Sequence, residues 1–460
     1  MRPSTLLRCF VAALVPVACT AGIDVEPGER VRGDSAPITG KEAHVDDTHA
    51  AVVAVMGGED RLCSGTIVGR GARGDSLYVL TAAHCCKSSA PPGAIRVGAD
   101  YTAPSRTLAV ERYRQHPCYN ALGHDYDFCV LEVKDEGTLN VQPIQLASAP
   151  DHLAAGSAVT FVGYGSTPAA NVARRKITTQ LAEVTPRTLA VDQTHDRGGI
   201  CFGDSGGPAL ITQDGIEVVA GVNSFGAPTS LCDVEGVAGR VDDPGVRAEF
   251  LDKVLAGEEP VIKALLILRT GIMPGPVRDT YLASDEPEQS FGHSVTLAVG
   301  TLPRSSASRR TLLRFELSGV PAGVTILSAR AGLHQESKTG PSTIAVHQVT
   351  KDWDEERETW ASFGEGGLDP IPLATFSNAT AVVSSTAQVW FDLTRPAQDW
   401  LAGRVVNHGV MLRALGPRQT QFMSSEIGRL AERPWMHLCY LPASARPDQP
   451  PPPADVRRMP

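Results

Sequence analysis

Three residue types that can perform nucleophilic catalysis stand in three separate short motifs of this sequence. Ser205 lies in GGICFGDSGGPAL, His84 in LTAAHC and Asp127 in HDYDFCVLEV. A serine hydroxyl becomes a useful nucleophile at neutral pH when a neighbouring imidazole removes its proton. The imidazole can return that proton to a leaving group, while a carboxylate orients the ring and stabilises its charged form. These residues predict acyl transfer at a Ser-His-Asp site that needs neither a metal nor a cofactor.

Chain length and charge limit the number of domains and the classes of partner that this protein can have. With 460 residues the chain is too long for one ordinary hydrophobic core, which predicts two domains of roughly 150–250 residues each. The formal net charge is −9 and no long basic block occurs. We therefore expect neither nucleic acid nor an anionic membrane as a partner.

The N-terminus has the pattern of a secretory signal. Arg2 and Arg8 precede an apolar run and then small residues, which predicts a signal peptide over 1–21 and a secreted protein, extracellular or periplasmic. Cys19 follows small residues as in a lipid-anchored bacterial protein, but Pro16 stands where such sites usually carry an aliphatic residue. We therefore prefer the secreted form to a lipid anchor. No later apolar run is long enough to span a bilayer.

Residues 50–245 contain many short β-type runs separated by turn residues, with no long amphipathic helix between them. This pattern favours an all-β barrel or sandwich. Apolar residues then recur at helical spacing in DPGVRAEFLDKVLAG at 243–257, where Val246, Phe250 and Val254 predict a closing helix. The GEEP that follows marks the expected domain boundary.

The second half predicts another all-β unit over 279–441, with 258–278 as a linker or as its first segment. Polar and apolar residues alternate in LLRFEL and STIAVHQV, which is typical of half-buried strands. The proline-rich end at 442–460 cannot bury enough apolar surface to fold, so we expect it to be disordered.

The motifs of the first half resemble those of the trypsin/chymotrypsin family of serine proteases. The resemblance covers 38–256 and is carried by ITGKEA, CSGTIV, LTAAHC, DFCVL, GICFGDSGGPAL, NSFG and GVAGRV, in the family's order. It implies an all-β, chymotrypsin-like double β-barrel over 38–257. It also implies that His84 is the general base, Asp127 its orienting partner and Ser205 the nucleophile.

Two neighbouring side chains are rivals for these roles. His124 lies three residues before Asp127 and could compete as the base, but it lacks the TAAHC context and falls in an expected loop. Asp125 is the analogous rival for Asp127. We prefer Asp127 because DFCVL fits the family's strand and DYDFC does not.

The resemblance also assigns the groups that surround the reacting bond. The backbone N–H groups of Gly203 and Ser205 would form an oxyanion hole, where one lost donor costs roughly 10²–10³ in rate. The implied specificity pocket consists of Gly199, Ile200, Phe202, Ser224, Gly226 and Gly236. Gly199 at the floor carries no charge, and an unpaired cation there would be costly, so we expect cleavage after apolar residues, chymotrypsin- or elastase-like. Asp233 and Glu235 are carboxylates that could reach inward and admit basic residues.

Activation is implied by the same resemblance. ITGKEA fits the family's mature N-terminus, so Ile38 would become the first residue and its amine would pair with Asp204. A propeptide over 22–37 would then keep the uncut chain largely inactive. Because Pro37 precedes the cut, rather than arginine or lysine, we expect a different protease to activate this one.

Eight of the ten cysteines lie beyond the signal peptide, and export makes disulfides chemically reasonable. The family resemblance implies two bridges, Cys63–Cys85 and Cys201–Cys232. Cys86 and Cys129 each lie two residues after a member of the His-Asp pair, so their backbones should be close and a Cys86–Cys129 bridge is favoured. Cys118 is the rival partner for Cys86, and Cys439 is expected to be a buried free thiol.

The second half resembles the DNRLRE-type β-sandwich modules appended to secreted bacterial enzymes, some of which are classed as carbohydrate-binding. The matching stretches include DTYL, WDEERETW and FDLTRPAQDWLAG. The resemblance implies a jelly-roll-like sandwich and suggests polysaccharide as a partner. Trp353, Trp360 and Trp400 could stack on sugar rings, but tryptophans in strands are more often core residues, and we prefer that interpretation.

Two function classes are therefore compared. The first is a secreted serine endopeptidase, made as a zymogen, that cleaves polypeptide substrates through an acyl-enzyme intermediate. The alternative is a catalytically silent binding protein that keeps the protease fold. Silent proteins of this kind usually lose a member of the triad or an oxyanion glycine, and all are present here, so we favour the enzyme.

Overall fold

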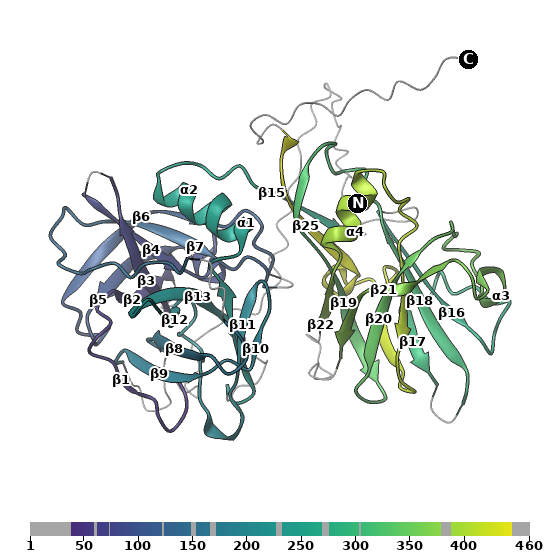
Figure 1. The fold of residues 1–460 in the computed structure, drawn as a ribbon, viewed down its shortest axis with the longest axis horizontal. Coiled ribbons are helices and arrows are strands. Elements are labelled where there is room, and N and C mark those ends of the chain that lie inside the picture. Colours follow the sequence, from purple (N-terminus) through teal and green to yellow (C-terminus); the bar gives the residue numbers. More distant parts are fainter. Residues whose placement is uncertain are drawn as a thin grey trace, which may run out of the picture.

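The computed structural model describes residues 38–443, apart from short gaps at 59–61, 73, 122–123, 149–152, 166–171, 227–231, 269–275, 303–304 and 379–387. The expected signal peptide, Cys19, the propeptide and nearly all of the proline-rich tail lie outside the described residues. Within them, no helix is long and apolar enough to cross a membrane. Figure 1 shows two β-domains side by side, joined in sequence through β15 (Lys263–Leu268).

The first domain consists of two antiparallel β systems. Six strands close into a barrel in the order β2-β3-β4-β7-β6-β5, and eight form a sheet in the order β1-β9-β8-β12-β13-β14-β11-β10. The barrel strands are β2 Val52–Gly57, β3 Leu62–Arg70, β4 Ser76–Thr81, β5 Pro92–Val97, β6 Arg106–Gln115 and β7 Cys129–Lys134. The sheet strands are β1 His44–Val45, β8 Ala158–Gly163, β9 Arg175–Gln180, β10 Glu183–Val184, β11 Thr188–Asp192, β12 Pro208–Gln213, β13 Ile216–Gly226 and β14 Glu235–Arg240. The expected all-β, trypsin-like architecture is confirmed.

The closing helix is present as three consecutive helical segments, α1 (Pro244–Val246), the π-helical η4 (Arg247–Leu251) and α2 (Asp252–Leu255). The carboxylate of Asp243 begins it by accepting hydrogen bonds from the backbone N–H groups of Gly245 and Val246. Val246, Phe250 and Val254 are buried, as the spacing predicts. Two short 3₁₀ helices, η2 (Ala83–Cys86) and η3 (Thr194–Asp196), complete the first domain.

The second domain is a single hydrogen-bonded set of eleven antiparallel strands that curls around its own core. The main path runs β15-β25-β19-β24-β17-β18-β23-β20-β21, with β16 paired to β18 and β22 to β19. The strands after β15 are β16 Val277–Ala283, β17 Thr296–Thr301, β18 Ser308–Phe315, β19 Thr325–Lys338, β20 Thr343–Val349, β21 Leu368–Ser377, β22 Gln388–Asp392, β23 Val410–Ala414, β24 Thr420–Met423 and β25 Trp435–Leu441. The helices are α3 Trp360–Phe363, α4 Thr394–Leu401 and the 3₁₀ turn η5 Leu430–Glu432. Since β15 pairs with β25, the segment 258–278 contains the first strand of this domain.

A disulfide bond and an ion pair join the two domains. Cys118 of the first domain forms a disulfide with Cys439 of β25, across 321 residues of sequence. Arg330 of β19 forms an ion pair with the buried Asp125. The expectation of a free thiol at Cys439 is therefore wrong, because its partner comes from a loop that no sequence pattern places beside β25.

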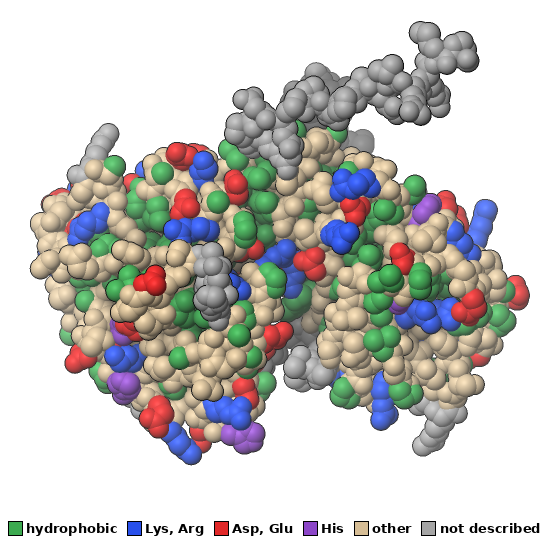
Figure 2. Space-filling view, viewed as in Figure 1, with side chains coloured by type: hydrophobic (Ala, Val, Ile, Leu, Met, Phe, Trp, Pro, Cys, Tyr) green, Lys and Arg blue, Asp and Glu red, His purple; other side chains and the backbone are tan. Residues whose placement is uncertain are grey.

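Arg187 adds a second group of contacts between the domains. Its guanidinium donates to the Ser328 hydroxyl at 2.7 Å and lies 3.4 Å from the Asp392 carboxylate, both in the second domain. It also lies over the ring of Tyr126, with 5.7 Å from its central carbon to the ring centroid. On the face drawn in Figure 2, Lys, Arg, Asp and Glu side chains are interspersed over both domains.

Two of the tryptophans considered for sugar stacking are core residues. Trp353 is 4 % exposed and donates its indole N–H to the carbonyl of His408, and Trp400 is 8 % exposed and donates to Gln348. Trp360 is partly buried, with the guanidinium of Arg310 over its ring at 4.3 Å. The preferred core interpretation is confirmed for Trp353 and Trp400.

Candidate active site

His84 and Asp127 meet where the 3₁₀ turn η2 faces the loop before β7. The ring Nδ1 of His84 lies 2.7 Å from one carboxylate oxygen of Asp127, and the backbone N–H of His84 donates to the other oxygen at 2.8 Å. Both side chains are largely buried, at 8 % and 2 % exposed. The two hydrogen bonds fix the plane of the imidazole, because ring and backbone are held by the same carboxylate.

Ser224 on β13 supplies a third donor to Asp127, because its hydroxyl donates to the oxygen that faces the imidazole. Burial alone would raise the pKa of Asp127. The His84 charge and hydrogen bond, together with the Ser224 hydrogen bond, outweigh it and lower the pKa to about 2. The carboxylate is therefore ionised at neutral pH. The sequence placed Ser224 in the specificity pocket, whereas its side chain contacts the carboxylate.

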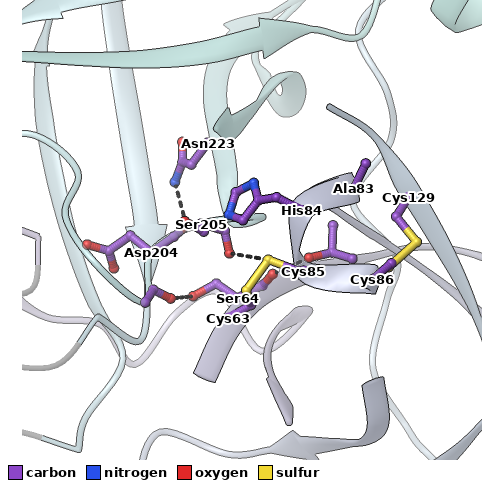
Figure 3. The surroundings of a disulfide bond; sticks show 12 residues. Cys63, Ser64, Ala83, His84, Cys85, Cys86, Cys129, Asp204, Ser205 and Asn223 are labelled. Atoms are coloured by element: carbon purple, nitrogen blue, oxygen red, sulfur yellow. Dashed lines mark hydrogen bonds between the residues drawn. A yellow bond between two sulfur atoms is a disulfide. The ribbon is translucent and has the colours of Figure 1, made fainter. Parts of the chain in front are cut away.

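Ser205 lies in the turn before β12, beside the Cys63–Cys85 disulfide. Its carbonyl accepts a hydrogen bond from the backbone N–H of Ser64 at 2.7 Å, which attaches the turn to β3. The Ser64 hydroxyl in turn donates to the carbonyl of Gly203 at 2.9 Å. Figure 3 shows the imidazole of His84 and the Ser205 turn on the same side of this disulfide. The structure thus brings the three residues singled out in the sequence into one region.

Two glycines of the turn are required by its backbone. Gly203 and Gly206 have φ of +89° and +83°, the left-handed region that residues with a Cβ rarely adopt. A Cβ at Gly206 would also lie 2.0 Å from the Thr81 hydroxyl and 2.4 Å from the Ser64 carbonyl. These constraints explain why the GDSGG pattern is glycine-rich.

Asp204 points away from Ser205 into the protein and is completely buried. Its oxygens accept backbone hydrogen bonds from Gly165 at 2.8 Å and Cys201 at 3.0 Å, and a further one from Ile38. Burial raises the pKa of Asp204 to about 7, which these hydrogen bonds only partly oppose. Ile38 is itself 2 % exposed. A positive charge at the Ile38 nitrogen would therefore stabilise the ionised form of Asp204.

The disulfides near the site are the expected ones. Cys63–Cys85, Cys86–Cys129 and Cys201–Cys232 are all formed, and the first two bracket His84. Although Cys63, His84 and Cys85 present three ligand-type atoms within 4.8 Å, both sulfurs belong to the disulfide. They are therefore not available as thiolate ligands.

The rivals considered for the histidine and aspartate have other contacts. His124 stacks on Phe225 with ring centroids 4.9 Å apart, and Asp125 pairs with Arg330. The hydrogen bond between imidazole Nδ1 and carboxylate joins His84 to Asp127.

The region assigned to the pocket contains a residue that the sequence analysis missed. Gln193, 2 % exposed, fills the space in front of both Gly199 and Gly236, so a Cβ on either glycine would collide with its amide. Ile200 is buried, whereas Phe202 is 36 % exposed and Gly226 is exposed. Asp233 is exposed too. No motif contains Gln193, since it lies in a loop whose path only the fold defines.

Comparison with known proteins agrees with this geometry. Residues 38–244 match the family model for trypsin. These residues form a trypsin-family domain. Residues 274–431 match the family model for carbohydrate-binding module family 96. This is the region whose motifs resemble DNRLRE-type modules.

Individual relatives of the trypsin-family domain are distant in sequence. The chain is 29 % identical to human transmembrane protease serine 5 over 201 residues, which cover 38 % of this chain and 43 % of that protein. It is 28 % identical to serine protease SP24D of Anopheles gambiae over 243 residues, covering 47 % and 85 %, respectively. It is 24 % identical to trypsin 5G1 of Aedes aegypti over 230 residues, covering 46 % and 83 %. The chain thus spans less than half of the human relative.

Proposed function

We propose that this protein is a secreted serine endopeptidase in which Ser205 attacks the peptide carbonyl and forms an acyl-enzyme. The observation that carries the proposal is the buried His84–Asp127 pair, held by two hydrogen bonds, beside the Ser205 turn. Family membership of the domain supports the same chemistry.

Each residue has a defined task in the proposed reaction. As the Ser205 oxygen bonds to the carbonyl carbon, its proton moves to Nε2 of His84, and the imidazolium is stabilised by the ionised Asp127. The negative charge on the carbonyl oxygen is stabilised by the N–H groups of Gly203 and Ser205. His84 then returns the proton to the leaving amine. A water molecule then attacks the acyl-enzyme, with His84 again accepting and returning the proton, and Ser205 is released.

A cut before Ile38 would complete this site. In the uncut chain, the buried Asp204 faces an uncharged amide at Ile38, and burial raises the pKa of its carboxyl to about 7. The cut converts that amide nitrogen to an ammonium, which can pair with the Asp204 carboxylate. Removing one member of such a buried pair costs about 3–5 kcal/mol.

The activation step can be measured directly. We expect protein whose first residue is Ile38 to hydrolyse peptides roughly 10²–10³ times faster than the same chain starting at residue 22, because only the former has the ammonium. A cleavage site for a specific protease, placed at 33–37, allows one sample to be assayed before and after the cut. Asp204→Asn serves as control and should stay inactive after cleavage. Full activity of the chain starting at residue 22, confirmed by N-terminal sequencing, would contradict the zymogen.

Binding of an acidic polysaccharide is a second function that we propose, for the module over 274–431. The match to a carbohydrate-binding family suggests a sugar ligand. The specific observation is a shallow hollow lined by Arg309, Arg310 and Arg413. Arg309 pairs with Asp285 and Arg310 with Glu365, so the exposed Arg413 is the guanidinium that we propose for the ligand. Arginine guanidinium groups form strong paired hydrogen bonds with carboxylates, which favours a uronic-acid polymer over a neutral one.

Retention on alginate beads tests this second function. The full chain carrying Ser205→Ala should be retained at low salt, and Arg413→Ala should reduce retention severalfold because the hollow loses a cation. Arg404→Ala is the matched control, since Arg404 is exposed and pairs with Asp399 away from the hollow. Equal retention of the Arg413 and Arg404 variants would reject the hollow as the binding site.

A further inference from the structure

The side chain of Gln193 occupies the base of the region where the two pocket glycines face each other. A Cβ at Gly199 would lie 2.6 Å from the amide carbon and amide oxygen of Gln193. A Cβ at Gly236 would lie 2.0 Å from the same oxygen and 2.8 Å from Ile200. Both glycines thus leave room for one glutamine, and the space that their lack of side chains creates is already filled.

The glutamine amide is fixed in place by the surrounding backbone. Its nitrogen donates to the carbonyl of Ile200 at 3.0 Å and to the carbonyl of Cys232 at 2.6 Å. Its oxygen accepts from the backbone N–H of Ile200 at 3.3 Å. Because both N–H bonds of the amide are used, the side chain joins the two segments linked by the Cys201–Cys232 disulfide. If the glutamine side chain moved away, the carbonyl groups of Ile200 and Cys232 would lose their hydrogen-bond donor, which is costly. The amide therefore forms a rigid floor to this region.

The hydrogen bonds that hold this floor come from backbone groups and not from a carboxylate. Glu235 lies next to Gly236 on β14, and side chains of adjacent strand residues point to opposite faces. Burial and the charge of Glu183 both raise the pKa of Glu235. Asp233 is exposed. A cationic side chain entering between Gly199 and Gly236 would therefore meet a neutral amide.

From these contacts we propose that Gln193 determines substrate specificity by closing the bottom of the pocket, so that the enzyme cleaves after small uncharged residues such as alanine. This inference rests on the proposed protease function and narrows its substrate class. A phenylalanine or arginine side chain is too long for the shortened pocket. The methyl group of an alanine side chain fits in the upper part of the pocket.

The test compares three matched peptides that differ only in Ala, Phe or Arg before the cleaved bond. Protein starting at Ile38 should give kcat/KM at least about tenfold higher for Ala than for Phe or Arg, as expected for steric exclusion from an apolar pocket. Gln193→Ala removes the floor and should raise the Phe-to-Ala ratio about 10- to 100-fold. Gln193→Met keeps a side chain of similar length and should preserve the preference for Ala.

A matched control and an independent readout separate the possible failures. Gln213→Ala makes the same chemical change at a site where the side chain bonds to Ser148, and it should leave the ratio unchanged. Active-site titration with a fluorophosphonate counts competent enzyme in every sample. Titratable enzyme that prefers Phe or Arg, or whose Gln193→Ala ratio equals the wild-type ratio, overturns the role of Gln193 alone. Absence of titratable enzyme in the wild-type protein overturns the protease function and this inference with it.

Discussion

Replacing Ser205 with alanine is expected to lower kcat/KM for peptide hydrolysis by about 10⁶-fold in protein that begins at Ile38. The alanine side chain has no oxygen to attack the carbonyl, so His84 has no proton to accept and no acyl-enzyme can form. The backbone donors and the binding surface are unchanged, which leaves a small residual rate above that in water.

The rate is measured with the best substrate of the peptide series at equal concentrations of folded protein. Ser157→Ala is a matched control because Ser157 lies on an exposed turn of the same domain, where its hydroxyl accepts a hydrogen bond from the backbone of Ala154. It should keep the wild-type rate. If Ser205→Ala retains more than a few per cent of the activity, another residue is the nucleophile and the assignment is wrong.

Replacing Asp127 with asparagine is expected to lower kcat by about 10⁴-fold. The charge that stabilises the imidazolium is lost. An amide N–H can also face Nδ1 of His84, and this favours the ring tautomer that cannot accept the Ser205 proton. Because the pKa of Asp127 is about 2, the wild-type carboxylate stays ionised across the usual assay range, and the loss should be present at every pH from 5 to 9.

Asp125→Asn provides the comparison for this prediction, since it makes the same change two residues earlier. Asp125 pairs with Arg330 of the second domain, so its replacement should lower the free energy of unfolding and leave kcat within about tenfold. Unfolding by urea and steady-state kinetics on the same samples separate the two effects. A 10⁴-fold loss of kcat for Asp125→Asn, with a small loss for Asp127→Asn, would exchange the two roles.

The sequence predicts the candidate site well where a short motif encodes both chemistry and backbone. GDSGG combines Ser205 with glycines that the turn requires, and LTAAHC places His84 directly after a buried strand. The Cys86–Cys129 bridge followed from the need for His84 and Asp127 to meet, and it is formed. The all-β class and the closing helix were predictable because hydrophobic periodicity reports local structure.

Features that depend on distant segments were not predictable. The Cys118–Cys439 bridge joins residues 321 apart, and nothing local to either cysteine specifies the other. Gln193 fills the space left by two glycines, which becomes visible only when its loop, the loop of Gly199 and strand β14 are packed together. Trp353 and Trp400 were weighed as strand residues, whereas Trp400 lies in α4 and Trp353 lies in a loop. Their burial depends on the segments packed around them, which no local pattern specifies.

The contact between the domains lies close to the candidate site. Asp125, which binds Arg330, is two residues from Asp127, and the loop that carries Cys118 leads into the same segment. The second domain therefore packs against the chain that holds the proposed catalytic carboxylate. This arrangement could not be read from two motif sets that each resemble a separate family.

Covalent labelling by a fluorophosphonate, followed by mass analysis of the peptide that contains Ser205, tests the central claim most directly. The reagent reacts with a serine only where a base and oxyanion donors activate it. In protein starting at Ile38 we predict stoichiometric modification of Ser205, with none in the Ser205→Ala variant. An unmodified Ser205 in folded, correctly cut protein would contradict the proposal that this chain is a serine protease.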